Sequence, residues 1–124
     1  MSNEINNLYE FANFRFDAEK GKLWQDEKLI LLSPKATELL KLLLEENGEF
    51  VSKEDIFDRV WADTFVEDGV LTQNIYTLRK FLGKDSNGHQ LIENRTRLGY
   101  RITVPVVSSS SENPSENNKV SAED

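Results

Sequence analysis

The chain has 124 residues, of which 38% are hydrophobic and 30% charged, with no cysteine and a formal net charge of −7. This length fits one domain, and no apolar run is long enough to span a membrane, so we expect a cytoplasmic protein without a secretory signal. The absence of cysteine excludes disulfides and thiolate metal ligands, and the negative total argues against a nucleic-acid partner, because phosphate recognition usually needs a basic surface.

The first part of the chain is predicted to form four short antiparallel strands. Aromatic and aliphatic residues are concentrated there in short runs, which is typical of strands with a buried face. Asn13 suits the first turn, and Gly21 closes a polar segment that suits the second. A third turn is predicted at the polar residues 25–28. The expected strands cover residues 8–11, 14–16, 22–24 and 29–32.

Two helices are predicted next. Ser33 is a favourable N-cap, Pro34 suits the first helical position, and Gly48 is the expected stop. The leucines between them span a sector so wide that the helix should be covered on more than one side. Ser52 is the expected cap of the second helix. Residues 49–51, between the two helices, are expected to pair as a short extended segment.

A third helix is predicted over residues 70–82, with Asp68 as its cap. Its apolar residues recur at helical spacing and form one line. The line consists of Leu71, Ile75, Leu78 and Leu82. The opposite side carries Gln73, Tyr76, Thr77 and Lys80, with Asn74 and Arg79 at the flanks. This helix is therefore expected to have one core face and one face of hydrogen-bonding and basic groups.

The last predicted element is a β-hairpin with a basic tip. It consists of residues 91–94, an Arg-rich turn at 95–99, and residues 100–104, where apolar and polar residues alternate. Gly99 is expected to provide a backbone with positive φ. We place the folded domain at residues 1–106 and interpret residues 107–124 as a disordered polar tail or linker, because they hold too few apolar residues to offset the entropy of ordering.

The charge is unevenly distributed along the chain. Residues 1–69 carry a net charge of −8, residues 70–105 carry +4, and residues 106–124 carry −3. Within the positive segment the basic residues are Arg79, Lys80, Lys84, Arg95, Arg97 and Arg101. Three helices followed by a basic-tipped hairpin is the element order of a winged helix. A helix fits the major groove of B-DNA, where Gln and Asn can pair with adenine, and an Arg-tipped hairpin can reach the adjacent minor groove.

Four stretches of the sequence resemble the OmpR/PhoB-type winged-helix domains. The longest, residues 66–82 (VEDGVLTQNIYTLRKFL), is similar to the segment that holds the recognition helix of that family. Residues 32–36 (LSPKA), 51–54 (VSKE) and 99–101 (GYR) are similar to its other hallmark stretches. The resemblance covers residues 9–105. It implies an α+β winged helix-turn-helix with an N-terminal four-stranded antiparallel sheet, three helices and a C-terminal β-hairpin wing.

The resemblance also implies a function, namely sequence-specific binding of double-stranded DNA by a transcription regulator. The third helix would enter the major groove and the wing the minor groove. The residues expected to contact DNA are Gln73, Asn74, Tyr76, Thr77, Arg79, Lys80, Lys84, Arg95, Arg97 and Arg101. Arg97, at the hairpin tip, is the strongest of these candidates, whereas Arg79 could instead pair with Glu67 or Asp68.

Further partners are implied by the same resemblance. The loop at residues 62–69, with Phe65, Glu67 and Asp68, would contact the transcription machinery through RNA polymerase. Two copies could bind tandem half-sites as a dimer. The start of the domain is similar to members that carry it at the N-terminus, so a membrane or sensor domain is expected beyond residue 124. Two departures from the family are the absence of Arg and His from the exposed face of the third helix and of Gly and Pro from residues 95–98.

Two classes of function other than DNA binding fit the sequence to different degrees. A winged helix that binds protein and not DNA would account for the negative total charge. An enzyme is not expected, because His89 is the only histidine and the sequence has no phosphate loop, nucleophile elbow or spaced carboxylate pair. Accordingly, no metal, cofactor or small-molecule substrate is expected.

Overall fold

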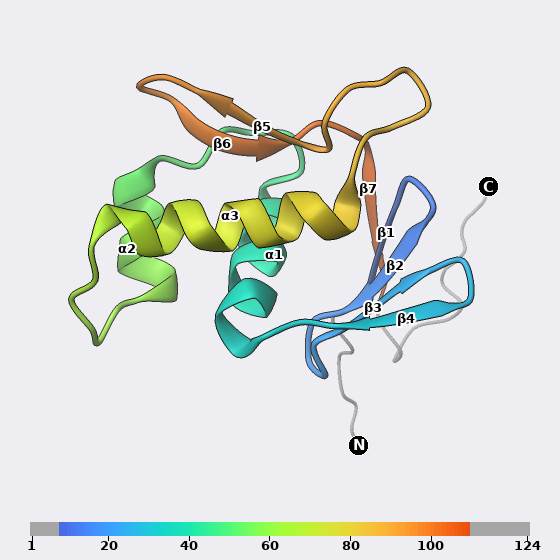
Figure 1. Cartoon of the computed structure of the whole chain (residues 1–124), viewed down its shortest axis with the longest axis horizontal. Helices are drawn as coiled ribbons and strands as arrows, with labels where there is room; N and C mark the ends of the chain where they lie inside the picture. Colours follow the sequence, from blue (N-terminus) through green and yellow to red (C-terminus); the bar gives the residue numbers. More distant parts are fainter. Residues whose placement is uncertain (1–7, 110–124) are drawn as a thin grey trace.

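The computed structural model describes residues 8–109, in which three helices lie on one side of a five-stranded sheet and a two-stranded hairpin packs beside them (Figure 1). None of the helices in this described part of the chain is long and apolar enough to cross a membrane. In chain order the elements are β1 (Leu8–Phe11), β2 (Phe14–Asp17), β3 (Lys22–Gln25), β4 (Lys28–Leu31), α1 (Pro34–Glu46), α2 (Lys53–Val60), α3 (Asp68–Leu82), β5 (Ile92–Arg95), β6 (Gly99–Ile102) and β7 (Val106–Ser109).

The N-terminal sheet has one strand more than the four predicted from the sequence. Its antiparallel order is β4-β3-β2-β1-β7, and β7 pairs with β1 from Leu8↔Ser109 to Phe11↔Val106. Without β7, β1 would present a row of unpaired backbone groups, and these groups can pair with a strand whatever its side chains are. Residues 107–109 therefore belong to the sheet and not to the predicted polar tail, of which residues 110–124 lie outside the described part.

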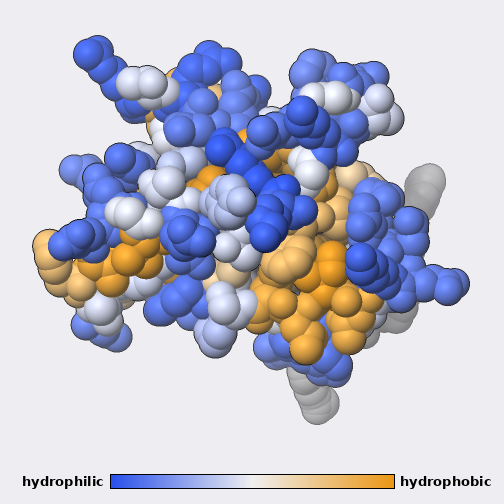
Figure 2. All heavy atoms as spheres, viewed as in Figure 1, coloured by the Kyte–Doolittle hydropathy of each residue, from blue (hydrophilic) through white to orange (hydrophobic). Residues whose placement is uncertain are grey.

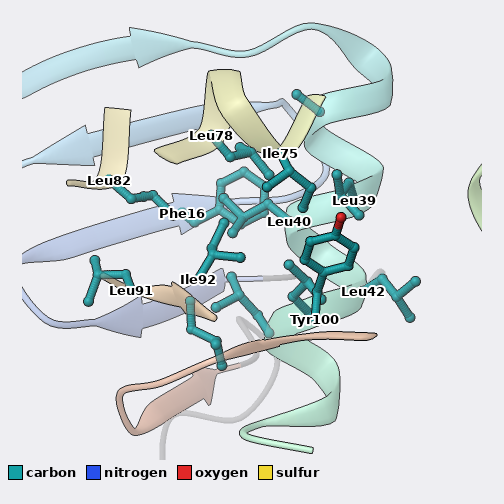
Figure 3. Close-up of a cluster of buried hydrophobic side chains, with 14 of the residues drawn as sticks. Phe16, Leu39, Leu40, Leu42, Ile75, Leu78, Leu82, Leu91, Ile92 and Tyr100 are labelled. Atoms are coloured by element: carbon teal, nitrogen blue, oxygen red, sulfur yellow. The ribbon is translucent and has the colours of Figure 1, made fainter. Parts of the chain in front are cut away.

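The hydrophobic core lies between this sheet and α1. Alternation along the strands and the register Phe16↔Leu23 and Leu23↔Ile30 put these three side chains on the same, buried face. The leucines of α1 meet them, together with side chains from α3 and β6 (Figure 3). Since α1 contacts α2, α3 and β6, the wide apolar sector predicted for it is confirmed. Burial of each such leucine stabilises the fold by about 1.5–3 kcal/mol.

The helix caps agree with the sequence at two of four predicted positions. The Oγ atoms of Ser33 and Ser52 accept hydrogen bonds from the backbone N–H groups of residues three positions later, at 3.2 and 3.1 Å. The predicted end of α1 at Gly48 was wrong by one residue. Asn47 already adopts the left-handed conformation (φ 45°), which Asn tolerates, and its backbone N–H donates to the carbonyl oxygen of Leu44. The cap of α3 was also wrong: Glu67 occupies the cap position without a side-chain hydrogen bond, and Asp68 is the first helical residue.

The wing is anchored to the helices by a third, very short strand-like segment. Val51 and Tyr100 exchange backbone hydrogen bonds of 2.8 and 3.0 Å, which confirms the predicted pairing of residues 49–51. Gly99 lies where this segment comes closest, with φ +111°, and a Cβ atom there would be 1.9 Å from the carbonyl oxygen of Val51. Glycine is required at this position both by the backbone conformation and by the close approach of two chain segments.

The loop between α3 and β5 is organised by Asp85. Its Oδ1 accepts hydrogen bonds from the backbone N–H groups of Asn87 and His89, both at 2.9 Å. These bonds, above all the one from His89, outweigh the effect of desolvation and lower the pKa of the Asp85 carboxyl. Because its folded pKa lies below its unfolded pKa, the ionised carboxylate stabilises the fold above about pH 4.

This stabilisation should be lost as pH falls through the folded pKa of Asp85. We expect Asp85→Ala to lower the free energy of unfolding at pH 7, with the difference from the wild type shrinking below about pH 4. Urea unfolding at a series of pH values measures both curves. Parallel curves for variant and wild type would contradict the role given to the ionised carboxylate.

Candidate nucleic-acid interface

The helix α3 separates a core face from an exposed polar face, as the sequence predicts. The core face is formed by Leu71, Ile75, Leu78 and Leu82, which are all buried. On the opposite side Gln73 and Lys80 are exposed, Tyr76 is 58% exposed and Thr77 is half-buried. The ammonium group of Lys80 lies 5.8 Å from the centre of the Tyr76 ring, a cation–π distance that limits the freedom of both side chains. Because these side chains are exposed and no other element is drawn in front of α3 in Figure 1, this polar face is accessible to a partner.

Two predicted contact residues at the flanks of α3 have partners within the protein. The side-chain amide of Asn74 donates to the carbonyl oxygen of Val70 at 2.9 Å. Arg79 donates through Nε and Nη2 to the carbonyl oxygen of Ile92, at 3.3 and 3.2 Å. Arg79 thus connects α3 to the first strand of the wing. Its partner is a backbone carbonyl, and not the carboxylate of Glu67 or Asp68 that the sequence suggested as an alternative.

The wing tip presents Arg97 to solvent. Residues 96–98 connect the paired residues Arg95 and Gly99, and the N–H of Leu98 donates to the carbonyl oxygen of Arg95 at 3.0 Å. Arg97 is the third residue of this turn and has φ +73°, a conformation for which such turns favour glycine or asparagine. An exposed arginine is therefore held in a backbone conformation that costs about 1–2 kcal/mol relative to the right-handed one.

The other two arginines of the wing share one carboxylate. Glu93 accepts from Nε of Arg101 at 2.7 Å and from Nη2 of Arg95 at 3.0 Å. The guanidinium groups of Arg101 and Arg95 also lie 4.8 and 5.8 Å from the centre of the Phe50 ring. The hydrogen bond from Arg101, followed by that from Arg95, lowers the pKa of Glu93, so this carboxylate is ionised at neutral pH. The sequence did not identify Glu93 and Phe50, although the predicted pairing of residues 49–51 and the hairpin alternation would have placed them near these arginines.

The loop before α3 carries the most exposed aromatic side chain among the large hydrophobic residues of the described chain. Phe65 is 94% exposed, and it borders a hollow that is also lined by Phe57 and Trp61. Of the two acidic residues predicted in this loop, Glu67 occupies the N-cap position of α3 without a side-chain hydrogen bond, and Asp68 forms an exposed ion pair with Lys53 at 3.4 Å. The loop is thus an exposed aromatic projection next to acidic groups.

The exposed face of α3 and the wing together form one hydrophilic surface. Figure 2 shows hydrophilic residues over the wing and much of α3, and apolar side chains gathered between the C-terminal end of α3 and β4. Leu31 of β4 and Phe81 of α3 are exposed in those two elements. Lys84, two residues after the end of α3, is exposed as well. The basic residues at positions 79–101 therefore lie on α3, on the wing and on the loop between them.

An N-terminal sheet, three helices and a β-hairpin wing define a winged helix-turn-helix domain. A profile of the family "Transcriptional regulatory protein, C terminal" matches residues 26–102, and the chain belongs to this family, which has the OmpR/PhoB-type fold. The family is one of transcriptional regulatory proteins.

Known relatives agree with this assignment. The transcriptional regulator HilA of Salmonella typhimurium is 39% identical over 102 residues, which cover 82% of this chain and 18% of HilA. The DNA-binding domain of Escherichia coli CadC shares the fold with a TM-score of 0.74 at 24% identity, over 85% of this chain and 99% of that one. The DNA-binding domain of Klebsiella pneumoniae RstA, solved in complex with the RstA box, has a TM-score of 0.66 at 18% identity, over 77% of this chain and 96% of that one.

Proposed function

We propose that this domain binds double-stranded DNA sequence-specifically, with α3 in the major groove and the wing in the minor groove. The observation that carries the proposal is the exposed polar face of α3 beside an exposed Arg97 at the wing tip. A helix and a basic hairpin in this arrangement match the width of the one groove and the negative potential of the other. The acidic remainder of the chain would repel DNA from the other faces and so orient its approach.

The individual residues have different roles in this proposal. Gln73, Tyr76 and Thr77 face base edges, while Lys80 and Lys84 neutralise phosphates on either side of the groove. Arg97 enters the minor groove. The remaining predicted contacts are bonded inside the protein; they are Asn74, Arg79, Arg95 and Arg101. In this proposal they hold the interface in shape, and they contact DNA only where DNA displaces those internal bonds.

Selection of binding sequences from a random duplex pool, followed by gel shift with the selected duplex, tests the proposal. We expect one enriched sequence that binds at least a hundredfold more tightly than random duplex, a modest ratio for specific recognition. A pool without enrichment would contradict sequence-specific binding.

The same gel shift should separate the two amides of α3. Gln73→Ala should lower affinity for the selected duplex about tenfold and leave binding to random duplex nearly unchanged, because it removes a base contact. Asn74→Ala is the matched control, since its amide is bonded to Val70, and its effect should be clearly smaller. Equal losses on selected and random duplex for Gln73→Ala would contradict a base-reading role.

The exposed Phe65 supports a second candidate function, binding to protein. We propose that the loop with Phe65, Glu67 and Asp68 contacts a protein of the transcription machinery, for which RNA polymerase is the candidate. Phe65→Ala should leave duplex affinity unchanged and reduce regulated transcription several-fold in a reporter assay. If Phe65→Ala weakened duplex binding instead, the loop would belong to the DNA interface. The alternative is a domain that binds only protein and no DNA. Enrichment of a duplex sequence in the selection experiment would exclude this alternative, and the absence of any duplex binding would support it.

The chain spans less than a fifth of the length of the relative HilA. Assembly as a dimer on tandem half-sites, a cytoplasmic location and a membrane or sensor domain beyond residue 124 are therefore proposals for the whole protein.

A further inference from the structure

The three arginines of the wing differ in what they contact. Arg97 is exposed at the tip, and in the part of the chain that the structure describes it forms none of the ion pairs. Arg95 and Arg101 are both bound by Glu93. The wing therefore presents one available guanidinium and two that already have a carboxylate partner.

The register of the hairpin explains why Glu93 reaches both arginines. Glu93 lies directly opposite Arg101 in the β5–β6 pair, and Arg95 is two residues further along β5, so all three side chains emerge on the same face. Tyr100 and Ile102, which flank Arg101, are buried on the other face. Phe50 lies against both guanidinium groups and limits their movement. Carboxylate and ring together hold the arginines along the surface of the wing.

A carboxylate that accepts from two guanidinium groups occupies donors that a phosphate would use. We propose that Glu93 is an internal competitor of DNA phosphate: it withholds Arg95 and Arg101 from the duplex and so limits the affinity of the wing. The inference rests on the proposed DNA-binding function. The bond from Arg95 is exposed to solvent and the bond from Arg101 is part-buried. Because both lie on the face of the wing opposite to the buried Tyr100 and Ile102, replacing Glu93 should release the arginines without disturbing the core.

Salt-dependent binding of the domain to one duplex tests this role of Glu93. Glu93→Gln keeps the shape of the side chain and removes its charge. We expect it to tighten binding about two- to fivefold at ~100 mM salt, which corresponds to the free energies of surface ion pairs. The slope of log K against log[salt] should steepen by about 0.9 for each phosphate newly contacted.

Two further variants separate competition from a general effect of charge. Glu49→Gln removes an equal charge beside Phe50, at an exposed residue that forms none of the ion pairs in residues 8–109, and should change affinity less than twofold. Arg95→Ala should have little effect in the wild type but should remove part of the gain in the Glu93→Gln background, with Arg101 accounting for the rest. This non-additivity is the signature of an arginine that is withheld by its partner.

Other results would overturn the inference. If Glu93→Gln weakened binding or left it unchanged, Glu93 would position the arginines for DNA or play no part. The effect would be one of overall charge, and not of competition, if Glu49→Gln and Glu93→Gln increased affinity equally. The same conclusion would follow if Arg95→Ala lowered affinity equally in the wild type and in the Glu93→Gln variant. Absence of duplex binding by the wild type would overturn the proposed function itself, whereas normal binding that Glu93→Gln does not alter would overturn only this inference.

Discussion

Replacement of Gly99 by alanine is expected to lower the free energy of unfolding by about 3–5 kcal/mol, the range of the most damaging single substitutions. The new Cβ atom would lie 1.9 Å from the carbonyl oxygen of Val51 and 2.8 Å from Cα of Ser52. Both neighbours are backbone, so no side chain can move aside. The φ of +111° is unfavourable for alanine in addition. The wing would have to separate from the 49–51 segment, and the hydrogen bonds between Val51 and Tyr100 would be lost.

Gly88→Ala is the matched control for this prediction. Gly88 also has a positive φ, +85°, but a Cβ atom there would meet nothing within 4 Å. It should therefore show the conformational cost alone, about 1–2 kcal/mol. Urea or thermal unfolding followed by circular dichroism compares the two variants. If Gly99→Ala were no more destabilising than Gly88→Ala, the close approach would not be what requires glycine.

The second large effect is expected at Arg97, where stability and DNA affinity should change in opposite directions. Arg97→Gly relieves the positive φ and should stabilise the domain by about 1 kcal/mol. The same change removes the guanidinium at the wing tip, so we expect about tenfold weaker duplex binding and a salt slope about 0.9 less steep, the loss of one phosphate contact. Glycine would fit this backbone conformation with less strain than arginine. The strained arginine is accounted for if its guanidinium binds DNA, as proposed above.

Two other substitutions define the contribution of charge at this position. Arg97→Ala should lose affinity as Arg97→Gly does, without the gain in stability, and Arg97→Lys should retain most of the salt slope. Unfolding and salt-dependent gel shift measure the two quantities separately. An unchanged salt slope in Arg97→Ala would show that the wing tip does not contact the DNA backbone.

Local sequence signals predicted the elements that depend on local physics. Ser33 and Ser52 cap their helices because a hydroxyl at that position reaches an N–H of its own first turn, and the apolar line of α3 follows from helical periodicity. Even so, α3 begins at Asp68, two residues before the predicted start, and the residue at its N-cap, Glu67, forms no side-chain hydrogen bond there. Ends of helices respond to small energies that a propensity argument does not resolve.

Features that depend on partners distant in the sequence were not predictable in the same way. Strand β7 exists because β1 offers a free edge, which the polar composition of residues 107–109 does not reveal. Arg79 binds the carbonyl oxygen of Ile92, an acceptor identified only once α3 and β5 are placed together. The shared carboxylate of Glu93 required the hairpin register. For the candidate site, the sequence identified the elements and their exposed faces, and the structure distinguished residues with internal partners from those open to a ligand.

The central claim is that duplex DNA binds to the polar face of α3 and to the wing. Amide chemical-shift changes of the isotopically labelled protein, recorded during titration with the selected duplex at ~50 mM salt, test it most directly, because they locate the bound surface and low salt favours phosphate contacts. We predict the largest changes at Gln73, Thr77 and Arg97, with little change at Leu29 and Leu31 of β4. Changes confined to β4 or to the loop around Phe65, or no change at any residue, would contradict the assignment of α3 and the wing as a DNA interface.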